Sequence, residues 1–295
     1  MTQAMRQIAA RLAVPTDDAR LLQLTNNAVF ALPKAGLVVR IARTHRLHDR
    51  VAKVSDLARW FAAIDAPSIR LAPVAQEPMV VGSLLASVWA YVPPTLPAPT
   101  VEDLGEVLRE FHSLPAPPIA LPEWDPIGDA RRRLADAEGI RHDEHDFLSQ
   151  WCDRLEPQVT ALMRQTSPRL VHGDAHVGNL LREPSGRVVM CDFDATCLGP
   201  WQVDLAAVAV GEVRFGGVGN HARLAAAYGF DVTTDPCWPL LREARELKMI
   251  AAAVPLLASS SAVAAEFYRR IRSAQTKDHE ARWRPFADLQ TPARR

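Results

Sequence analysis

Residues 169–194 read RLVHGDAHVGNLLREPSGRVVMCDFD, and they carry the strongest structural pattern in the chain. It begins as an apolar strand, passes into a polar loop that contains Asp174, and continues as two short apolar segments around a Pro-Ser-Gly turn at 184–186. The second segment ends directly in Asp-Phe-Asp at 192–194. Loops this rich in His, Asp and Asn rarely serve packing alone. The stretch therefore predicts a functional site built on a β-hairpin.

The expected turn also predicts which side chains of the hairpin meet. If Ser185 and Gly186 form a two-residue turn, Asn179 lies directly opposite Asp192, with Cβ atoms about 5 Å apart. An amide oxygen and a carboxylate at that separation suit Mg²⁺, which takes few protein ligands. Asp174 then remains to accept the proton of an attacking hydroxyl in a phosphoryl transfer. Asp194 is left open as either a second metal ligand or a cap of the following segment.

A larger motif surrounds these residues: His-Gly-Asp followed by Asn179, then Asp-Phe-Asp, Gly-Pro at 199–200, and Asp204-Leu-Ala. In spacing and order the motif resembles the aminoglycoside phosphotransferase and choline kinase-like family. That resemblance implies a two-lobed, protein-kinase-like fold and transfer of the γ-phosphoryl group of ATP or GTP to a small-molecule hydroxyl. It implies Asp174 as the catalytic base, Asn179 and Asp192 as Mg²⁺ ligands, and His172 and Asp204 as supports of the loop.

The chain before this motif predicts a small β-rich lobe. Two apolar alternating runs, 27–32 and 37–42, flank a Pro-Lys-Ala-Gly turn and indicate a β-hairpin, and apolar residues at helical spacing predict a helix over 51–61. Further strands are expected at 70–74 and 79–91. A Pro-rich connector follows at 93–99.

Beyond the connector the pattern becomes mainly helical, with helices expected over 101–113 and from Gly128. The predicted class is α+β. Residues 1–92 are expected to form an antiparallel, nucleotide-binding N-terminal lobe, and residues 93–295 a larger catalytic and substrate-binding lobe.

The nucleotide side matches the resemblance less closely. The family usually has Lys on a central strand to hold the phosphates, whereas this chain offers Arg40, which keeps the charge and has a planar guanidinium suited to phosphate. The alternative is an Arg on the solvent face of an edge strand. The helix that follows contains no Glu to orient Arg40, only the shorter Asp49 and Asp56. Asn26 and Asn27 stand where a glycine-rich loop is expected, or they form a plain turn.

The resemblance also places the nucleotide base at the end of the last strand of the small lobe. There the family binds the base through backbone groups, so Trp89, Ala90 and Val92 are the expected contacts. The same apolar run is also typical of a core strand.

Composition bounds the class and the compartment. Lys plus Arg (34) equals Asp plus Glu (34), so no global field favours nucleic acid or an anionic membrane. Four cysteines without a CxxC pair, and an N-terminus without the apolar core of a signal peptide, predict a cytoplasmic protein that does not enter a membrane. The oligomeric state is left open.

The phosphate acceptor is left open as well. An aminoglycoside is a polycation and needs several carboxylates, for which Glu212, Asp231, Glu243 and Glu246 are candidates, while a neutral sugar or amino alcohol fits equally. Two rivals remain. Arg40 and the missing Glu favour a catalytically impaired kinase-like protein that binds a nucleotide or metabolite. A metal-dependent hydrolase is weaker, because it leaves the small lobe unexplained.

Overall fold

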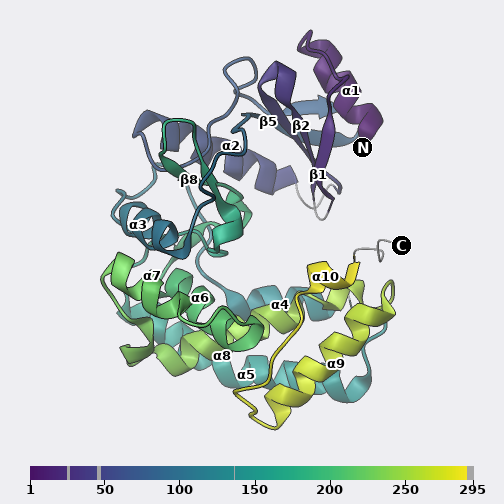
Figure 1. Ribbon diagram of the computed structural model, residues 1–295. Helices are drawn as coiled ribbons and strands as arrows, with labels where there is room; N and C mark the ends of the chain where they lie inside the picture. The colour runs from purple at the N-terminus through teal and green to yellow at the C-terminus, as the bar shows by residue number, and fades with distance from the viewer. Residues whose placement is uncertain (25–26, 45–47, 136, 291–295) are drawn as a thin grey trace. The chain divides into compact units, whose positions relative to one another are not determined.

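The computed structural model describes residues 1–24, 27–44, 48–135 and 137–290 (Figure 1). The chain divides into two compact units: the first joins Met1–Leu121 to His176–Thr196, and the second joins Pro122–Ala175 to Cys197–Arg295. The segment His176–Thr196 belongs to the first unit because its backbone forms hydrogen bonds there. Ile69 N donates to Met190 O, and Met190 N donates to Pro67 O, each at 2.9 Å. The functional lobes expected at 1–92 and 93–295 stay a prediction.

A five-stranded antiparallel sheet forms the centre of the first unit, in the order β1-β2-β3-β5-β4. Its strands are β1 (Arg20–Leu24), β2 (Asn27–Leu32), β3 (Leu37–Ala42), β4 (Met79–Val81) and β5 (Leu84–Ala90). The predicted hairpin is confirmed with the expected bounds, because Gly36 takes the left-handed conformation (φ 65°) that closes the turn. The strand expected at 70–74 is wrong: that segment contributes one isolated bridge, from Leu71 to Trp89.

Helices complete the first unit. Helix α1 (Thr2–Arg11) buries Met5 and Ile8 in the same cluster as Val39 and Ile41 of β3. Helix α2 (His48–Ala63) confirms the helix expected over 51–61, and α3 (Val101–His112) begins with a capping box between Thr100 and Asp103. A second hairpin pairs β7 (Leu180–Arg182) with β8 (Val188–Met190).

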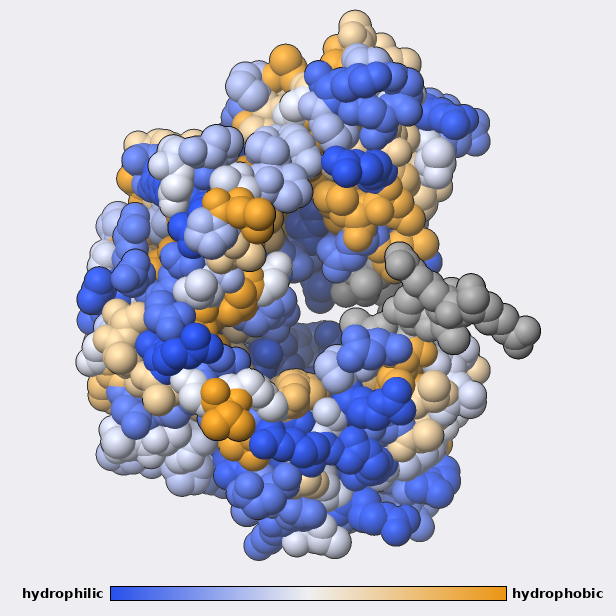
Figure 2. Space-filling model, viewed as in Figure 1, coloured by the Kyte–Doolittle hydropathy of each residue, from blue (hydrophilic) through white to orange (hydrophobic). Residues whose placement is uncertain are grey.

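The outer strand β1 leaves apolar surface uncovered. Leu21, Leu22 and Leu24 are each about half exposed. Figure 2 shows the corresponding orange patch over this strand.

The second unit is mainly helical, as predicted. It contains α4 (Pro126–Ala135), α5 (His142–Gln165), α6 (Gln202–Phe215), α7 (Asn220–Tyr228), α8 (Trp238–Ala251), α9 (Ser261–Gln275), α10 (Phe286–Gln290) and a two-stranded sheet of β6 (Arg169–Val171) and β9 (Cys197–Gly199). Within the described ranges, no helix is long and apolar enough to span a bilayer.

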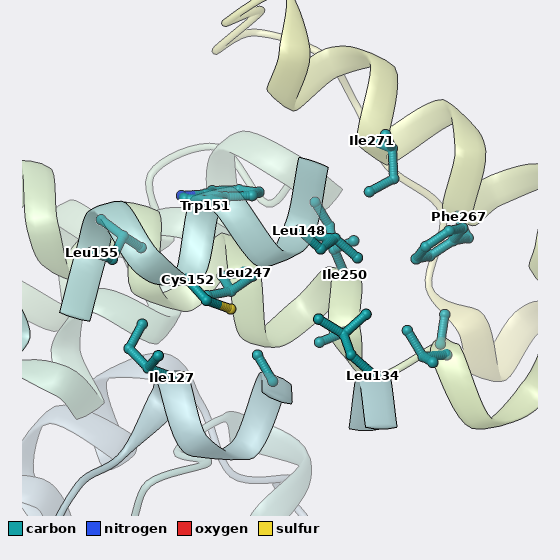
Figure 3. Packing of buried hydrophobic residues seen from close by; sticks show 14 of the residues in the cluster. Ile127, Leu134, Leu148, Trp151, Cys152, Leu155, Leu247, Ile250, Phe267 and Ile271 are labelled. Atoms are coloured by element: carbon teal, nitrogen blue, oxygen red, sulfur yellow. The ribbon is translucent and has the colours of Figure 1, made fainter. Parts of the chain in front are cut away.

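Helix α8 lies within the core of this unit. Its Leu247 and Ile250 pack against Leu148 and Cys152 of α5 and against Phe267 of α9 (Figure 3). Because these side chains are fully enclosed, the position of α8 is set by packing. That matters for the site, since the polar side chains of α8 are held on a rigid element.

Two ion pairs are enclosed in the same unit. Arg214 Nη2 lies 2.8 Å from Glu246 Oε1 of α8, and both side chains are almost completely buried. Arg270 pairs with Glu266 in a similar way, and burial lowers the pKa of Arg270 to about 10. A buried charge that loses its partner is strongly destabilising.

We therefore expect Glu246→Ala to lower the free energy of unfolding by about 3 to 5 kcal/mol, because it leaves the Arg214 guanidinium buried without its carboxylate. Urea denaturation followed by circular dichroism measures this. The control is Glu156→Ala, which breaks an exposed pair with Arg131 and should leave the denaturation midpoint close to wild type. Equal midpoints for the two variants would contradict the account.

Candidate active site

The Asp-Phe-Asp segment of the first unit directly follows β8. Asp192 adopts a left-handed conformation (φ 64°), which is uncommon for a residue other than glycine and persists only where the surrounding structure holds it. Phe193 is fully buried, with its ring centroid 5.0 Å from Phe61 of α2 and 6.3 Å from Phe111 of α3. The buried Phe193 ring therefore anchors the segment, and with it the carboxylates of Asp192 and Asp194 on either side.

Both carboxylates converge on Arg40. Its Nη2 lies 3.0 Å from Asp192 Oδ1 and 2.7 Å from Asp194 Oδ2, and its side chain is only 15% exposed. The interpretation of Arg40 as a residue on the solvent face of an edge strand is wrong, because β3 lies between β2 and β5. One guanidinium thus contacts two carboxylates in a partly buried position, where charge-assisted hydrogen bonds are strong.

Helix α2 contributes a lysine, Lys53, to this segment, whereas the family usually has a Glu on this helix. Lys53 Nζ donates to the backbone oxygens of Asp194 (2.8 Å) and Thr196 (2.9 Å). Of the two acids considered for the role of the missing Glu, Asp56 pairs with Arg59 and Asp49 is exposed. The helix thus holds the backbone beside Asp194, and Arg40 takes its carboxylate partners from the Asp-Phe-Asp segment.

Asn26 and Asn27 are the residues expected either to replace a glycine-rich phosphate loop or to form a plain turn. Asn27, at the start of β2, is buried, and its Nδ2 donates to Asp194 Oδ2 at 3.2 Å. Asn26 lies outside the described residues. The Asp194 carboxylate therefore pairs with Arg40 and accepts a hydrogen bond from Asn27.

The register of the second hairpin differs by one residue from the prediction. Leu180 pairs with Met190, and Asn179 O accepts from Cys191 N at 2.9 Å, so Asn179 lies opposite Cys191 rather than Asp192. The reason is the turn: Gly186 is left-handed (φ 90°), and Glu183 N donates to Arg187 O at 2.8 Å. This closes a three-residue loop, which moves the pairing by one position.

The oxygen donors of the first unit suit Mg²⁺. Asn179 is largely buried, and the carboxylates of Asp192 and Asp194 both contact Arg40 Nη2. Among the described residues no three His, Cys, Asp or Glu side chains gather as a complete metal cage. Mg²⁺ is commonly held by one or two carboxylates together with nucleotide phosphates, so the donor set fits this ion.

The residues expected at the nucleotide base lie at the end of β5. The Trp89 side chain is buried and its Nε1 donates to Ser87 Oγ at 2.8 Å, so this ring belongs to the core. Ala90 N donates to Arg70 O at 2.9 Å, which leaves other backbone atoms for any base contact. Val92 follows the strand and is half-buried.

In the second unit, the loop after β6 is held from below by Asp204 of α6. This carboxylate is fully buried and accepts the backbone N–H groups of His172 (2.7 Å) and Gly173 (2.8 Å). His172 is also buried, and its Nδ1 accepts from Asp174 N at 3.3 Å. The loop is thereby fixed in a single conformation, with the Asp174 side chain 42% exposed.

Helix α8 brings two cations to Asp174. Arg245 Nη1 lies 3.1 Å and Lys248 Nζ 3.9 Å from Asp174 Oδ1, and Lys248 Nζ also donates to Gly173 O at 2.5 Å. Burial, followed by the positive charge of Arg245, lowers the pKa of Lys248. The carboxylate is thus available at the surface of the unit and paired with basic groups.

Sequence reasoning missed three of these residues: Lys53, Arg245 and Lys248. All three lie on helices, where a basic residue is usually solvated, and their partners are 71 to 141 positions away in the chain. The available signal was Arg245 and Lys248 at i and i+3 on the same face as the buried Leu241 and Ala244.

The model of the phosphotransferase enzyme family matches residues 20–247, and the chain belongs to this family. By class it is therefore a kinase of small molecules. No curated protein matches the chain.

Among solved structures, the fold is similar to a choline/ethanolamine kinase family protein from Mesorhizobium loti (16% identity, 98% of this chain and 96% of that chain, TM-score 0.63). It is also similar to a microcompartment-associated aminopropanol kinase (19%, 94% and 98%, TM-score 0.68). A third is the aminoglycoside phosphotransferase APH(3'')-Id from Streptomyces rimosus (15%, 84% and 97%, TM-score 0.65). At these identities the likeness shows the fold, and it confirms the α+β, kinase-like class expected from the sequence.

Replacing Asp204 by alanine removes the acceptor of two buried backbone N–H groups, and a buried donor without a partner costs about 1 to 3 kcal/mol. We expect Asp204→Ala to lower the free energy of unfolding by about 2 to 4 kcal/mol in urea denaturation. Asp204→Asn keeps one acceptor oxygen and should lose less. If Asp204→Ala stays within about 0.5 kcal/mol of wild type, Asp204 does not hold the loop.

Proposed function

We propose that this chain transfers the γ-phosphoryl group of ATP or GTP to a hydroxyl of a small molecule. The observation that carries the proposal is the convergence of Asp192 and Asp194 on Arg40 of the central strand β3. Two carboxylates beside a fixed guanidinium supply both charges that phosphoryl transfer needs: oxygens for a divalent cation, and a cation for phosphate oxygens.

In the proposed reaction the acceptor oxygen forms a bond to the γ-phosphorus while the bond from that phosphorus to the bridging oxygen of the diphosphate breaks. The hydroxyl proton passes to the Asp174 carboxylate, and the nucleoside diphosphate leaves. Asn179 and Asp192 would hold Mg²⁺, which neutralises charge on the phosphates when it is bound.

Arg40 would bind the nucleotide phosphates, and the backbone near Ala90 and Val92 would meet the base. Asp204 and His172 keep Asp174 in place, as their hydrogen bonds to the loop indicate. The neighbours include an ADP complex of a spectinomycin phosphotransferase and a GDP complex of a kanamycin-bound phosphotransferase, so both nucleotides are to be tested here.

The compartment remains an expectation. Cys152 is buried, Cys237 is half-buried, and both are thiols. Thiols of this kind support a reducing compartment, and we propose the cytoplasm.

One observation favours an alternative. In the family, a Glu on the helix after β3 usually orients the basic residue of the central strand. Here Lys53 on that helix binds backbone oxygens of the Asp-Phe-Asp segment, and Asp56 pairs with Arg59, so neither residue takes the place of that Glu. A catalytically impaired member of the family that binds a nucleotide or metabolite would show such a departure. Nucleotide-dependent phosphoryl transfer above background, in the presence of Mg²⁺, separates this alternative from the kinase.

The test of the proposal begins with a screen of sugars, aminoglycosides, amino alcohols and hydroxy acids for acceptor-dependent release of ADP or GDP. With the best acceptor, Asp174→Asn should lower kcat by about a hundredfold or more, because proton acceptance by a positioned base contributes about that much. Thermal unfolding should stay close to wild type, since the side chain is partly exposed.

The matched control for this measurement is Asp153→Asn, an exposed carboxylate on α5 that pairs with Arg131, for which we expect wild-type turnover. Near-normal turnover of Asp174→Asn would refute the assignment of the base.

A further inference from the structure

A small pocket in the second unit opens beside Gly173, the residue that precedes Asp174. One face of α8 forms its wall, with Leu241, Ala244, Arg245 and Lys248 spaced at i, i+3, i+4 and i+7. Trp124 adds an aromatic side. The pocket is therefore apolar on its walls, and the polar side chains that reach it are basic.

The charges at this pocket do not balance. Arg245 and Lys248 are both basic and share the carboxylate of Asp174, and no carboxylate is among the described residues that line the pocket. Two cations at i and i+3 on one helix repel each other. Asp129 also acts on Lys248 but does not line the pocket, so the polar part of the pocket wall is basic and suits an anionic group.

Arg245 also has a donor to spare. Its Nη1 bonds to Asp174, but its Nε is buried and has no hydrogen-bond partner among the described residues. An unsatisfied buried donor costs free energy, which a bound acceptor recovers. The guanidinium presents several N–H groups in one plane and binds carboxylate or phosphate oxygens with two parallel bonds.

The four acids that the sequence offered for a polycation do not lie at this pocket. Of the four acids considered for a polycation, Glu246 is buried with Arg214, Glu243 accepts from Trp151 and Arg154, and Asp231 accepts from His221 and Thr233. Glu212 accepts the backbone N–H groups of Gly219 and His221. Each carboxylate is thus already used within the unit, and none of the four lines the pocket.

We infer that the hydroxyl acceptor of this kinase carries an anionic group, a carboxylate or a phosphate, which Arg245 and Lys248 bind while the hydroxyl lies at Asp174. This inference rests on the proposed function, since it takes Asp174 as the base. It makes the substrate a small hydroxylated acid, in contrast to the aminoglycosides and amino alcohols named for the similar structures.

The test measures binding first, by calorimetry on the full-length protein at fixed ionic strength, with four probes of similar size: glycerate, glycerol phosphate, glycerol and ethanolamine. We expect glycerate or glycerol phosphate to bind and the neutral and cationic probes not to bind. Which of the two anions binds more tightly decides between carboxylate and phosphate.

Variants then locate the site. Arg245→Met and Lys248→Met should each weaken the anionic probe at least about tenfold, the effect of losing a charge-assisted hydrogen bond. Arg242→Met removes the same charge from the same helix, but Arg242 bonds to Glu246 and to His279 O, so its affinity for the probe should stay at wild type. Circular dichroism checks that all three variants are folded.

The inference is overturned if neither anion binds, if ethanolamine or glycerol binds as tightly as the anions, or if the anion binds equally well to Arg245→Met and Lys248→Met. Its failure can be told apart from failure of the proposed function. Transfer to cationic acceptors, with no anion binding, leaves a kinase without the anion site. Anion binding without any nucleotide-dependent transfer leaves the site and removes the kinase reaction.

Discussion

The ion pairs between Arg40 and the two carboxylates of the Asp-Phe-Asp segment are the interaction on which the site of the first unit depends. Asp192 and Asp194 carry like charges two positions apart in the chain, and a single guanidinium nitrogen contacts both in a partly buried position. A cation between two carboxylates offsets their repulsion, and its low exposure makes the attraction stronger than at the surface. Arg40 thus gives the two acids a shared cationic partner, and Asn27 adds a hydrogen bond to Asp194.

Several weaker contacts fix the same segment. Phe193 packs against the rings of Phe61 and Phe111, which also contact each other, and Lys53 donates to the backbone oxygens of Asp194 and Thr196. The packing of Phe193 anchors the side chain of the segment, and the hydrogen bonds of Lys53 hold its backbone. This support is consistent with the left-handed backbone of Asp192, since a strained residue persists only where its surroundings hold it.

The second unit solves a different problem, which is to keep one carboxylate accessible on a rigid loop. Asp204 holds the backbone from the buried side, and the cations of α8 contact Asp174 from the other. Because α8 is packed into the core through Leu247 and Ile250, Arg245 and Lys248 are positioned by the same apolar contacts that stabilise the unit. In the inferred anion site, the apolar core therefore fixes the position of the basic groups that select the charge of the acceptor.

The sequence predicted the parts of this architecture that depend on local pattern. The hairpin 27–32 and 37–42 was predicted with its observed bounds because its turn is governed by neighbouring residues, and α2 because its apolar spacing is regular. The second hairpin was displaced by one residue, since the left-handed Gly186 lengthens the loop, and spacing alone does not distinguish a two-residue from a three-residue turn. Lys53 and Arg245 were missed because their partners are distant in the chain, and only the packing of helices brings them together. Which residues bear the reaction remains a prediction from the motif.

The most direct measurement is calorimetry of ATP and of GTP binding with and without Mg²⁺, on the wild-type chain and on Asp192→Asn. The account predicts that Mg²⁺ tightens nucleotide binding in the wild type and that this effect is lost in Asp192→Asn, because one carboxylate of the pair at Arg40 no longer offers a charged oxygen to the ion. An equal effect of Mg²⁺ on both proteins, with both folded, would contradict it.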